Sequence, residues 1–288
     1  RLAERRFLEA NGASVAPWRE IGSPADLDTG VSELGIPLRL KASMGGYDGR
    51  SQLRIAETAD LAEARRMVEA ELGGGRPLLL ERELPFEAEL SVIIARAVDG
   101  VTTSFPVARN VHEHGILMES SAPAGIPEDV EHEAGALGTD LATGMGMVGL
   151  LTVELFLMAD GSLVVNELAP RVHNSGHWTI ESAATDQFEQ HVRAICGLPL
   201  GSTELQVPGA ATVNLLGSGP NRPARSTGVD QALDVTGVHV HLYDKRRVFE
   251  RRKMGHVTAI AATATDALRI ARDAAGRVGW ADETGEGS

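Results

Sequence analysis

Two glutamates, Glu154 and Glu167, interrupt apolar stretches of sequence that have the composition of β-strands. Between them lies Asp160-Gly161, a pair typical of a two-residue hairpin turn. Such a turn pairs Ala159 with Ser162, and the same register places Glu154 directly opposite Glu167. Two carboxylates in that position repel each other unless a cation joins them, and Mg²⁺ prefers oxygen ligands. The spacing therefore predicts a Mg²⁺ site, the alternatives being one exposed and one salt-bridged glutamate, or a longer turn that breaks this register.

Lysine is rare in this chain, which has only three lysines among its 27 basic residues: Lys41, Lys245 and Lys253. Lys41 ends a short predicted strand, and a glycine-rich stretch follows at residues 44–50. Glycines allow backbone amides to approach phosphate oxygens, and a lysine at the strand end can reach the same phosphates. This arrangement predicts a phosphate-binding loop, with an ordinary glycine-rich turn as the alternative.

Two further segments are dense in polar side chains. Residues 166–177 read Asn-Glu-Leu-Ala-Pro-Arg-Val-His-Asn-Ser-Gly-His and offer several hydrogen-bond donors to an anion or a small polar substrate. Residues 245–253 contain six basic side chains and one acidic side chain. We interpret this second segment as a phosphate-binding cluster, and the alternatives are a solvated basic face or a nucleic-acid patch.

The composition narrows the class of protein. The chain has 288 residues, 43% of them hydrophobic, which suffices for two folded domains. Its net charge of −13 argues against a general nucleic-acid binder, because phosphate backbones select basic surfaces. The single cysteine, Cys196, excludes an intrachain disulfide and a cysteine-rich zinc module. No apolar run approaches the roughly 18 residues that a membrane span needs. We therefore expect a cytoplasmic protein that binds neither membranes nor nucleic acid.

Helical and extended patterns alternate along the chain, which indicates the α+β or mixed α/β class. Helices are predicted over residues 1–11, 60–72, 128–141, 184–196 and 265–277, and strands over 78–81, 89–98, 149–158, 162–167, 211–216 and 238–243. The glycines at 144–149 have the spacing of a dinucleotide-binding fingerprint. That fingerprint needs a strand before it and a helix after it, and the predicted order here is the reverse.

Several stretches match a known family in order along nearly the whole chain: Lys41 with Gly45–Arg50, Glu81–Ser91, Phe105–His112, Asn166–His177, and His241–Lys245 with Arg252–His256. On these residues the chain resembles the 5-(carboxyamino)imidazole ribonucleotide synthases, ATP-grasp ligases of bacterial and fungal purine synthesis. The string Asn-Glu-x-Ala-Pro-Arg-x-His-Asn-Ser-Gly-His at 166–177 is the most specific part of the resemblance.

The resemblance implies an ATP-grasp fold of the α+β class, in which two α+β subdomains clasp ATP, with a small C-terminal β-rich extension. The corresponding segments are a linker helix at 1–20, a small subdomain with the phosphate flap at 21–84, a large subdomain with the metal and substrate site at 85–200, and a substrate-phosphate subdomain at 201–288. The family's N-terminal α/β domain has no counterpart in these residues. We therefore expect a shortened gene product or a fragment of a longer protein.

The resemblance also implies the reaction, an ATP-dependent carboxylation of 5-aminoimidazole ribonucleotide by bicarbonate through carboxyphosphate. The cofactors would be ATP and Mg²⁺, the partners small-molecule substrates, and the full-length form a homodimer. Carried over by position, the ATP-binding residues are Arg1, Lys41, Gly46, Tyr47, Asp48, Gly49, Arg50, Glu81, Leu84, Glu89, His112, Asn166 and Glu167. The substrate-binding residues are Tyr47, Asp48, Arg50, Arg171, His173, Asn174, Ser175, Lys245 and Arg252, of which Asp48, Arg171, His173 and Asn174 are expected to be catalytic. Glu154 and Glu167 are the expected metal ligands.

One departure from the family lies in the flap, where Ser51 replaces a glycine, and we expect it to stiffen the flap without removing a ligand. Other functions remain open at this point. One is a different ATP-grasp carboxylate–amine ligase, against which the substrate loop at 171–177 argues. Another is a catalytically silent nucleotide-binding module, and a third is a nucleic-acid binder that uses residues 245–253.

Overall fold

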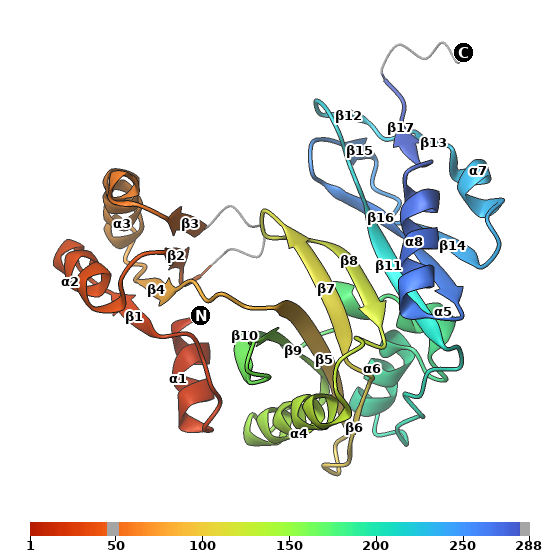
Figure 1. Ribbon diagram of the computed structural model, residues 1–288, viewed down its shortest axis with the longest axis horizontal. Coiled ribbons are helices and arrows are strands. Elements are labelled where there is room, and N and C mark those ends of the chain that lie inside the picture. Colours follow the sequence, from red (N-terminus) through yellow and green to blue (C-terminus); the bar gives the residue numbers. More distant parts are fainter. Residues whose placement is uncertain (45–51, 283–288) are drawn as a thin grey trace. The chain divides into compact units, whose positions relative to one another are not determined.

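The computed structural model describes residues 1–44 and 52–282, so the predicted ligands Gly46, Tyr47, Asp48, Gly49 and Arg50, together with Ser51, lie outside the described residues. The chain divides into two compact units. The first, unit 1, comprises Arg1–Ala88, His114–Ile116 and Glu154–Leu168, and the second, unit 2, comprises Glu89–Glu113, Leu117–Val153 and Ala169–Ser288. Both contain helices and mainly antiparallel strands, which confirms the α+β class (Figure 1).

Unit 1 is built on a four-stranded antiparallel sheet with the strand order β1-β4-β2-β3. Helices α2 and α3 contact each other and pack against this sheet (Figure 1). Aliphatic side chains from the sheet and from both helices form the core between them. The elements are α1 (Leu2–Ala10), β1 (Trp18–Ile21), α2 (Pro24–Leu34), β2 (Leu38–Ala42), β3 (Gln52–Ile55), the 3₁₀ turn η1 (Thr58–Asp60), α3 (Leu61–Gly73) and β4 (Leu78–Arg82).

Helix α2 shows how the sequence sets the boundaries of these elements. Ser23 caps its N-terminus by accepting a hydrogen bond from the Asp26 backbone amide, and Pro24 occupies the first helical position. Gly30, inside the helix, allows the close approach to the sheet, because a Cβ atom there would lie 2.7 Å from a methyl group of Leu80. The small residue therefore fixes how closely α2 packs on β4.

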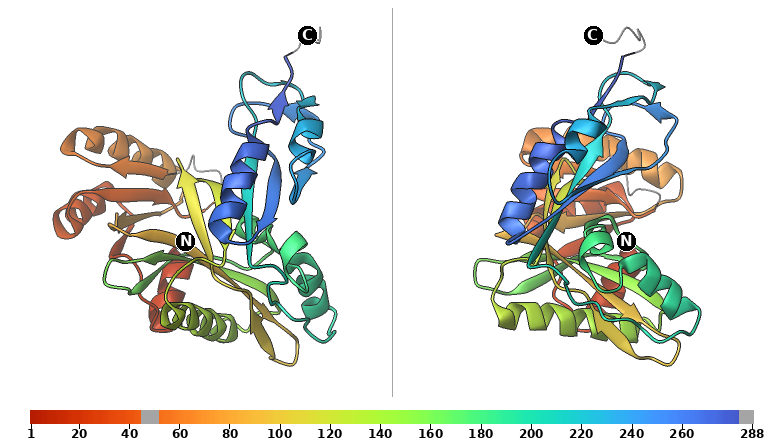
Figure 2. Two further views of the ribbon diagram at one scale, coloured as in Figure 1. Left: turned by 45° about the vertical axis from the view of Figure 1, so that its right-hand side comes forward. Right: turned by 90° about the vertical axis from the view of Figure 1, so that its right-hand side faces the viewer.

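Unit 2 contains a larger sheet with the strand order β9-β5-β7-β8-β11-β16-β14, with β6 beside β5. Helix α8 packs against β11 and β16 (Figures 1 and 2). The elements that lie wholly or partly in unit 2 are β5 (Ala88–Arg96), β6 (Thr102–Ser104), β7 (Ala108–Glu113), β8 (Ile116–Ala122), α4 (Glu128–Gly144), β9 (Gly149–Leu157), β10 (Leu163–Ala169), the 3₁₀ turn η2 (Asn174–Gly176), α5 (Thr179–Ser182), α6 (Gln187–Ile195), β11 (Gly209–Leu216), β12 (Arg222–Pro223), β13 (Ser226–Thr227), α7 (Val229–Leu233), β14 (Val238–Leu242), β15 (Arg247–Val248), β16 (Lys253–Ala261), α8 (Ala264–Ala275) and β17 (Gly279–Trp280).

The hairpin between β9 and β10 differs from the prediction by one residue. The Met158 amide donates to the Ser162 carbonyl, and the Gly161 amide donates to the Met158 carbonyl, each at 2.9 Å. The loop therefore has three residues, with Gly161 in the left-handed region at φ 85°. Asp160 stabilises this turn because its Oδ1 accepts hydrogen bonds from both the amide and the hydroxyl of Ser162.

This turn moves the register by one, so that Glu154 is level with Asn166. A side-chain hydrogen bond supports this register, because Asn166 Nδ2 donates to Glu154 Oε2 at 3.3 Å. The prediction that Glu154 stands directly opposite Glu167 is therefore wrong, and the longer turn is the reason.

Candidate functional site

A buried cluster of charges lies inside unit 1, where Glu81 on β4 meets two cations. Arg5 on α1 donates to Glu81 Oε2 at 2.8 Å, and Lys41 on β2 forms an ion pair with Glu81 Oε1. The side chains of Arg5 and Glu81 are only 3% and 6% exposed. Burial acts to raise the pKa of Glu81, but the charges of Lys41 and Arg5 outweigh it and hold this pKa below its ordinary value. The cluster carries a net positive charge at the end of the strand that precedes the predicted phosphate loop.

The two glutamates predicted to bind Mg²⁺ also lie in unit 1, each half-buried beside a different partner. Glu154 accepts the hydrogen bond from Asn166, and Glu167 Oε2 accepts one from Arg1 at 2.9 Å. Within residues 1–44 and 52–282 no group of three or more histidine, cysteine or acidic side chains forms a metal site. Two carboxylates and the Asn166 amide oxygen form an oxygen-only set of donors, which is the chemistry that suits Mg²⁺ when phosphates supply further ligands.

Two of the predicted nucleotide ligands meet in unit 2. His112 on β7 and Glu89 on β5 lie on adjacent strands, and His112 Nδ1 is 2.8 Å from Glu89 Oε2. Both side chains are about one-fifth exposed, so that each can still reach a ligand. Leu84, predicted to contact adenine, is half-buried in the segment of unit 1 that leads from β4 to β5.

In the polar loop at 171–177, His173 is held in one tautomer by a chain of hydrogen bonds. Asn110 Nδ2 donates to Ser91 Oγ, and Ser91 Oγ donates to Ser175 Oγ, each at 2.9 Å. Ser175 Oγ lies 2.8 Å from His173 Nδ1. Because the amide nitrogen can only donate, the direction of the chain makes Nδ1 the final acceptor. The Ser175 backbone amide also donates to Nδ1, at 3.3 Å. The ring proton of neutral His173 is therefore on Nε2, where it is a donor.

Asn174, the next residue of this loop, has an unsatisfied side chain. Its Nδ2 and Oδ1 atoms are both buried, and neither has a hydrogen-bond partner among the residues that the structure describes. A buried amide in this state costs free energy unless a ligand satisfies it. Asn174 is therefore suited to bind a polar molecule through one donor and one acceptor.

Lys245 and Arg252 form a cationic pair in the C-terminal part of unit 2. Burial and, after it, the charge of Arg252 lower the pKa of Lys245. Lys245 donates to the Lys253 carbonyl, and Arg252 donates to the Arg247 carbonyl at 2.6 Å. In the described part of the chain no carboxylate forms an ion pair with either side chain. Two neighbouring cations without an acidic partner favour an anionic ligand.

Comparisons with known proteins agree with this geometry. Residues 6–188 match the ATP-grasp domain family, and residues 210–270 match the phosphoribosylaminoimidazole carboxylase C-terminal domain. A crystal structure of an ADP complex of N5-carboxyaminoimidazole ribonucleotide synthetase is 40% identical, with a TM-score of 0.85 over 95% of this chain and 70% of that one. This chain belongs to the N5-carboxyaminoimidazole ribonucleotide synthase family of ATP-grasp proteins. The prediction of an ATP-grasp fold is confirmed.

Other members of the ATP-grasp family support the same assignment. The Bacillus subtilis (strain 168) N5-carboxyaminoimidazole ribonucleotide synthase is 41% identical over 90% of this chain and 65% of its own length. The Aspergillus clavatus enzyme in complex with ADP and 5-aminoimidazole ribonucleotide is 31% identical, with a TM-score of 0.83 over 95% of this chain and 71% of that one. The Dictyostelium discoideum bifunctional purine synthesis protein purC/E is 39% identical over 90% of this chain. The chain spans about two thirds of the bacterial relative and 27% of the Dictyostelium protein.

The sequence analysis missed two buried glutamines of α6, of which Gln187 supports the polar loop and Gln190 supports a neighbouring segment. Gln187 on α6 is fully buried, and its side chain binds both backbone groups of His173, accepting from the amide and donating to the carbonyl at 2.8 Å each. Gln190, one turn later, binds both backbone groups of Gly201 in the same way, at 2.9 and 2.8 Å. On α6 the two glutamines are buried, whereas the apolar Phe188 and Val192 are exposed. An amphipathic pattern would place the apolar residues inside, so the sequence alone contains no signal that these glutamines have buried partners.

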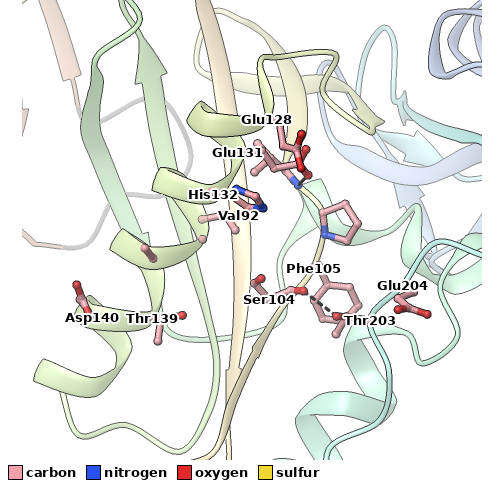
Figure 3. A pocket seen from close by; sticks show the side chains of 14 residues that line it. Val92, Ser104, Phe105, Glu128, Glu131, His132, Thr139, Asp140, Thr203 and Glu204 are labelled. Carbon is pink, nitrogen blue, oxygen red and sulfur yellow. Dashed lines mark hydrogen bonds between the residues drawn. The ribbon is translucent and has the colours of Figure 1, made fainter.

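A separate cavity of about 620 Å³ lies beside α4 in unit 2 (Figure 3). Glu128, Glu131 and His132 of α4 line one side, and Thr203 and Glu204 line another. None of the residues predicted to bind ATP, substrate or metal is among those that line it. This cavity is therefore not the site that the family resemblance implies. No helix in the described part of the chain has the length and the apolar character that a membrane span requires.

Proposed function

We propose that this chain catalyses the ATP-dependent carboxylation of 5-aminoimidazole ribonucleotide. Bicarbonate takes the γ-phosphoryl group of ATP, which gives carboxyphosphate and ADP. The exocyclic amine of the ribonucleotide then attacks the carboxyl carbon and loses a proton, and phosphate leaves. The observation that carries the proposal is that unit 2 contains both the cationic pair of Lys245 and Arg252 and a polar loop whose Asn174 amide has no partner among the described residues. The names of the relatives support this choice of substrate.

For ATP, we propose that Lys41 and Arg1 contact the phosphates and that Glu81 and Leu84 lie beside the adenine. Glu89 and His112 then bind the ribose side of the nucleotide. The net positive charge of the Arg5–Lys41–Glu81 cluster supports this proposal, because it favours the approach of a polyanion. Preorganised cations of this kind stabilise the charge that develops on the phosphoryl oxygens.

For the metal, we propose that Glu154 and Glu167 hold Mg²⁺ with Asn166 beside them. The donor set fits, since it consists of oxygen atoms on a paired hairpin and contains neither sulfur nor imidazole. When bound, Mg²⁺ supplies charge neutralisation for phosphoryl transfer. The protein's own part is to orient both carboxylates, through Asn166 for Glu154 and through Arg1 for Glu167.

For the ribonucleotide, we propose that the polar loop holds the reacting end and that Lys245 and Arg252 hold its phosphate. His173 presents an Nε2–H donor, Arg171 a cation, and Asn174 both a donor and an acceptor. Donors of this kind neutralise the carboxyl oxygens of the intermediate as the amine attacks. We further propose a cytoplasmic location, in which the exposed thiol of Cys196 stays reduced, and a homodimer.

Phosphate release from ATP tests the proposed function. We expect release to require both bicarbonate and 5-aminoimidazole ribonucleotide. Release that needs a different amine or carboxylate acceptor would indicate another ATP-grasp ligase. Nucleotide binding without any acceptor-dependent release would indicate a silent module.

We expect Lys245→Ala and Arg252→Ala to raise the KM for the ribonucleotide about ten- to a hundredfold, since each removes a charge-assisted contact of about 1.5–3 kcal/mol. The KM for ATP should change by less than about twofold, because the residues proposed for ATP are elsewhere in the sequence. Steady-state kinetics with each substrate varied in turn provide the measurement. Equal losses for both substrates would show that the pair is structural or serves ATP.

We expect Gln187→Leu to raise the KM for the ribonucleotide, because it leaves the amide and carbonyl of His173 without partners and loosens the loop. The loss of stability should be about 1–3 kcal/mol. Gln190→Leu is the matched control, since it breaks two equivalent bonds to Gly201, outside the loop. Gln190→Leu should lower the free energy of unfolding by a similar amount and leave the KM for the ribonucleotide unchanged. Equal KM effects from both variants would contradict a specific role for Gln187.

A further inference from the structure

Three histidines of unit 2 form a column of stacked rings. The ring of His256 on β16 lies between those of His177 and His241, at centroid distances of 4.5 Å to each and interplanar angles of 17° and 18°. His241 on β14 is the cross-strand partner of His256, which explains one of the two stacks. His177 directly follows η2 in the polar loop. The column therefore joins that loop to the two C-terminal strands β14 and β16.

The middle ring of the column is linked through Tyr243 to the cationic pair of Lys245 and Arg252. The Tyr243 hydroxyl lies 2.9 Å from His256 Nδ1. The ammonium group of Lys245 lies over the Tyr243 ring, 5.4 Å from its centroid, at the distance of a cation–π contact. A continuous set of contacts thus runs from His177 through His256 and Tyr243 to Lys245. Its two ends are the polar loop and the cation proposed to bind the substrate phosphate.

The surroundings keep the middle of this column uncharged. His256 is 2% exposed, and burial, followed by the charges of His177 and His241, lowers its pKa to about 2. Burial also lowers the pKa of His177 to about 4, with smaller contributions from His173, Lys253 and His241. At the outer end, Glu181 on α5 lies 2.5 Å from His241 Nε2. Neutral aromatic rings can stack at these distances, whereas adjacent imidazolium rings would repel each other.

No requirement of the fold explains why a histidine occupies the centre of this column. His256 Nε2 is buried and has no hydrogen-bond partner among the described residues, which is a cost that an apolar residue at this position would avoid. Among the described residues, the polar contact of this ring is the one between its Nδ1 atom and the Tyr243 hydroxyl. The retained imidazole therefore serves the link to Tyr243 rather than the packing of β16.

We propose that His256 is a positioning residue that, through its stacked neighbours and the Tyr243 hydroxyl, fixes the separation between the polar loop and Lys245. This inference rests on the proposed function, since the two ends of the ribonucleotide must fit both parts at once. A substrate held at two points is oriented for reaction only if those points keep their spacing. His256 touches no reacting atom in this scheme and acts through Lys245 and His177.

The first test is Tyr243→Phe, which keeps the ring over which Lys245 lies and removes only the hydroxyl. We expect the KM for the ribonucleotide to rise about three- to tenfold, with little change in the KM for ATP. His256→Phe keeps a ring in the stack but loses the same hydrogen bond, and should have a similar effect. His239→Gln, an exposed histidine on the same strand as His241, is the control and should behave as wild type.

A double-mutant cycle separates positioning from general destabilisation. If Tyr243 acts through Lys245, then Tyr243→Phe should add little to the KM effect of Lys245→Ala. If the two residues act independently, the fold-changes in KM of the two single variants should multiply in the double variant. Unchanged ribonucleotide KM in both Tyr243→Phe and His256→Phe, measured on folded protein, would overturn the inference while leaving the proposed function intact. Fully multiplicative effects would also overturn it. A wild-type chain that lacks ribonucleotide-dependent phosphate release would overturn the proposed function and the inference together.

Discussion

ATP turnover should fall by about a thousandfold or more in Glu154→Gln and in Glu167→Gln, with the fold retained. Each substitution replaces a charged oxygen ligand by a neutral amide of the same size, and bound metal contributes several kcal/mol to charge stabilisation in phosphoryl transfer. Neither residue is fully buried, so loss of the charge costs little folding free energy. Phosphate release measured over a range of Mg²⁺ concentrations, together with circular dichroism, provides the comparison.

Asp160→Asn is the control for this experiment, because Asp160 is a carboxylate of the same hairpin whose contacts are confined to the turn. It should keep activity within about twofold and change stability little, because the Oδ1 atom of asparagine can accept the same two hydrogen bonds from Ser162. Arg1→Gln leaves both proposed metal ligands in place but removes the ion pair of Glu167 and a proposed phosphate contact, so it should also weaken the binding of ATP. Near wild-type turnover in either glutamine variant would contradict the metal assignment.

The sequence predicted most of the elements because their signals are local. The helices at 60–72, 128–141 and 265–277 and the strands at 78–81 and 149–158 lie within one to three residues of α3, α4, α8, β4 and β9. Apolar periodicity, capping residues and glycine ends are all contained in such short windows. The positions of helix ends are predicted less well: the helix predicted at 184–196 begins only at Gln187, after a bend at Ala184 and Thr185, and Asp186 caps it.

The register of the β9–β10 hairpin was wrong because turn length depends on a competition that residue types alone do not resolve. Asp-Gly fits a two-residue turn, and it fits equally the last two positions of a three-residue loop that ends in a left-handed glycine. The hydroxyl of Ser162, which bonds to Asp160, favours the second form. A one-residue change at the turn then alters every cross-strand neighbour of Glu154.

The contacts that complete the site were not predictable, because they join residues far apart in sequence. Gln187 reaches back to His173, and His256 stacks on both His177 and His241. Such contacts depend on how β14, β16 and α6 pack around the loop rather than on local pattern. The family resemblance named the loop and the cations, whereas the packing shows Gln187 bonded to His173 and the His256 ring between those of His177 and His241.

Glu81→Gln should be the most destabilising single substitution among those considered, at about 3–5 kcal/mol. The carboxylate lies between Arg5 and Lys41, and its removal leaves two buried cations without a counter-charge. Such a loss is a large part of the 5–15 kcal/mol that typically stabilises a domain. Arg5→Met should cost less, because the pair of Lys41 and Glu81 survives. Urea unfolding of each variant at neutral pH measures the differences.

Glu83→Gln is the matched control for Glu81→Gln, since Glu83 also binds two cations, Arg39 at 3.2 Å and Arg54 at 2.7 Å, but is 25% exposed. Solvent screening reduces the value of such a pair, and we expect a loss of at most about 1 kcal/mol. Equal losses from the two variants would show that burial does not set the cost.

The pH dependence of stability provides an independent test of the same charges. Glu81 has a folded pKa below its ordinary value of 4.5, so its contribution is complete above that value. It is lost as the pH falls from 4.5 through the lower folded pKa. Wild-type stability should therefore fall steeply in this acid range, and the free energy of unfolding of Glu81→Gln should fall less, because its side chain does not titrate. Parallel slopes for the two proteins below pH 4.5 would show that Glu81 is not the carboxylate that Arg5 and Lys41 keep ionised.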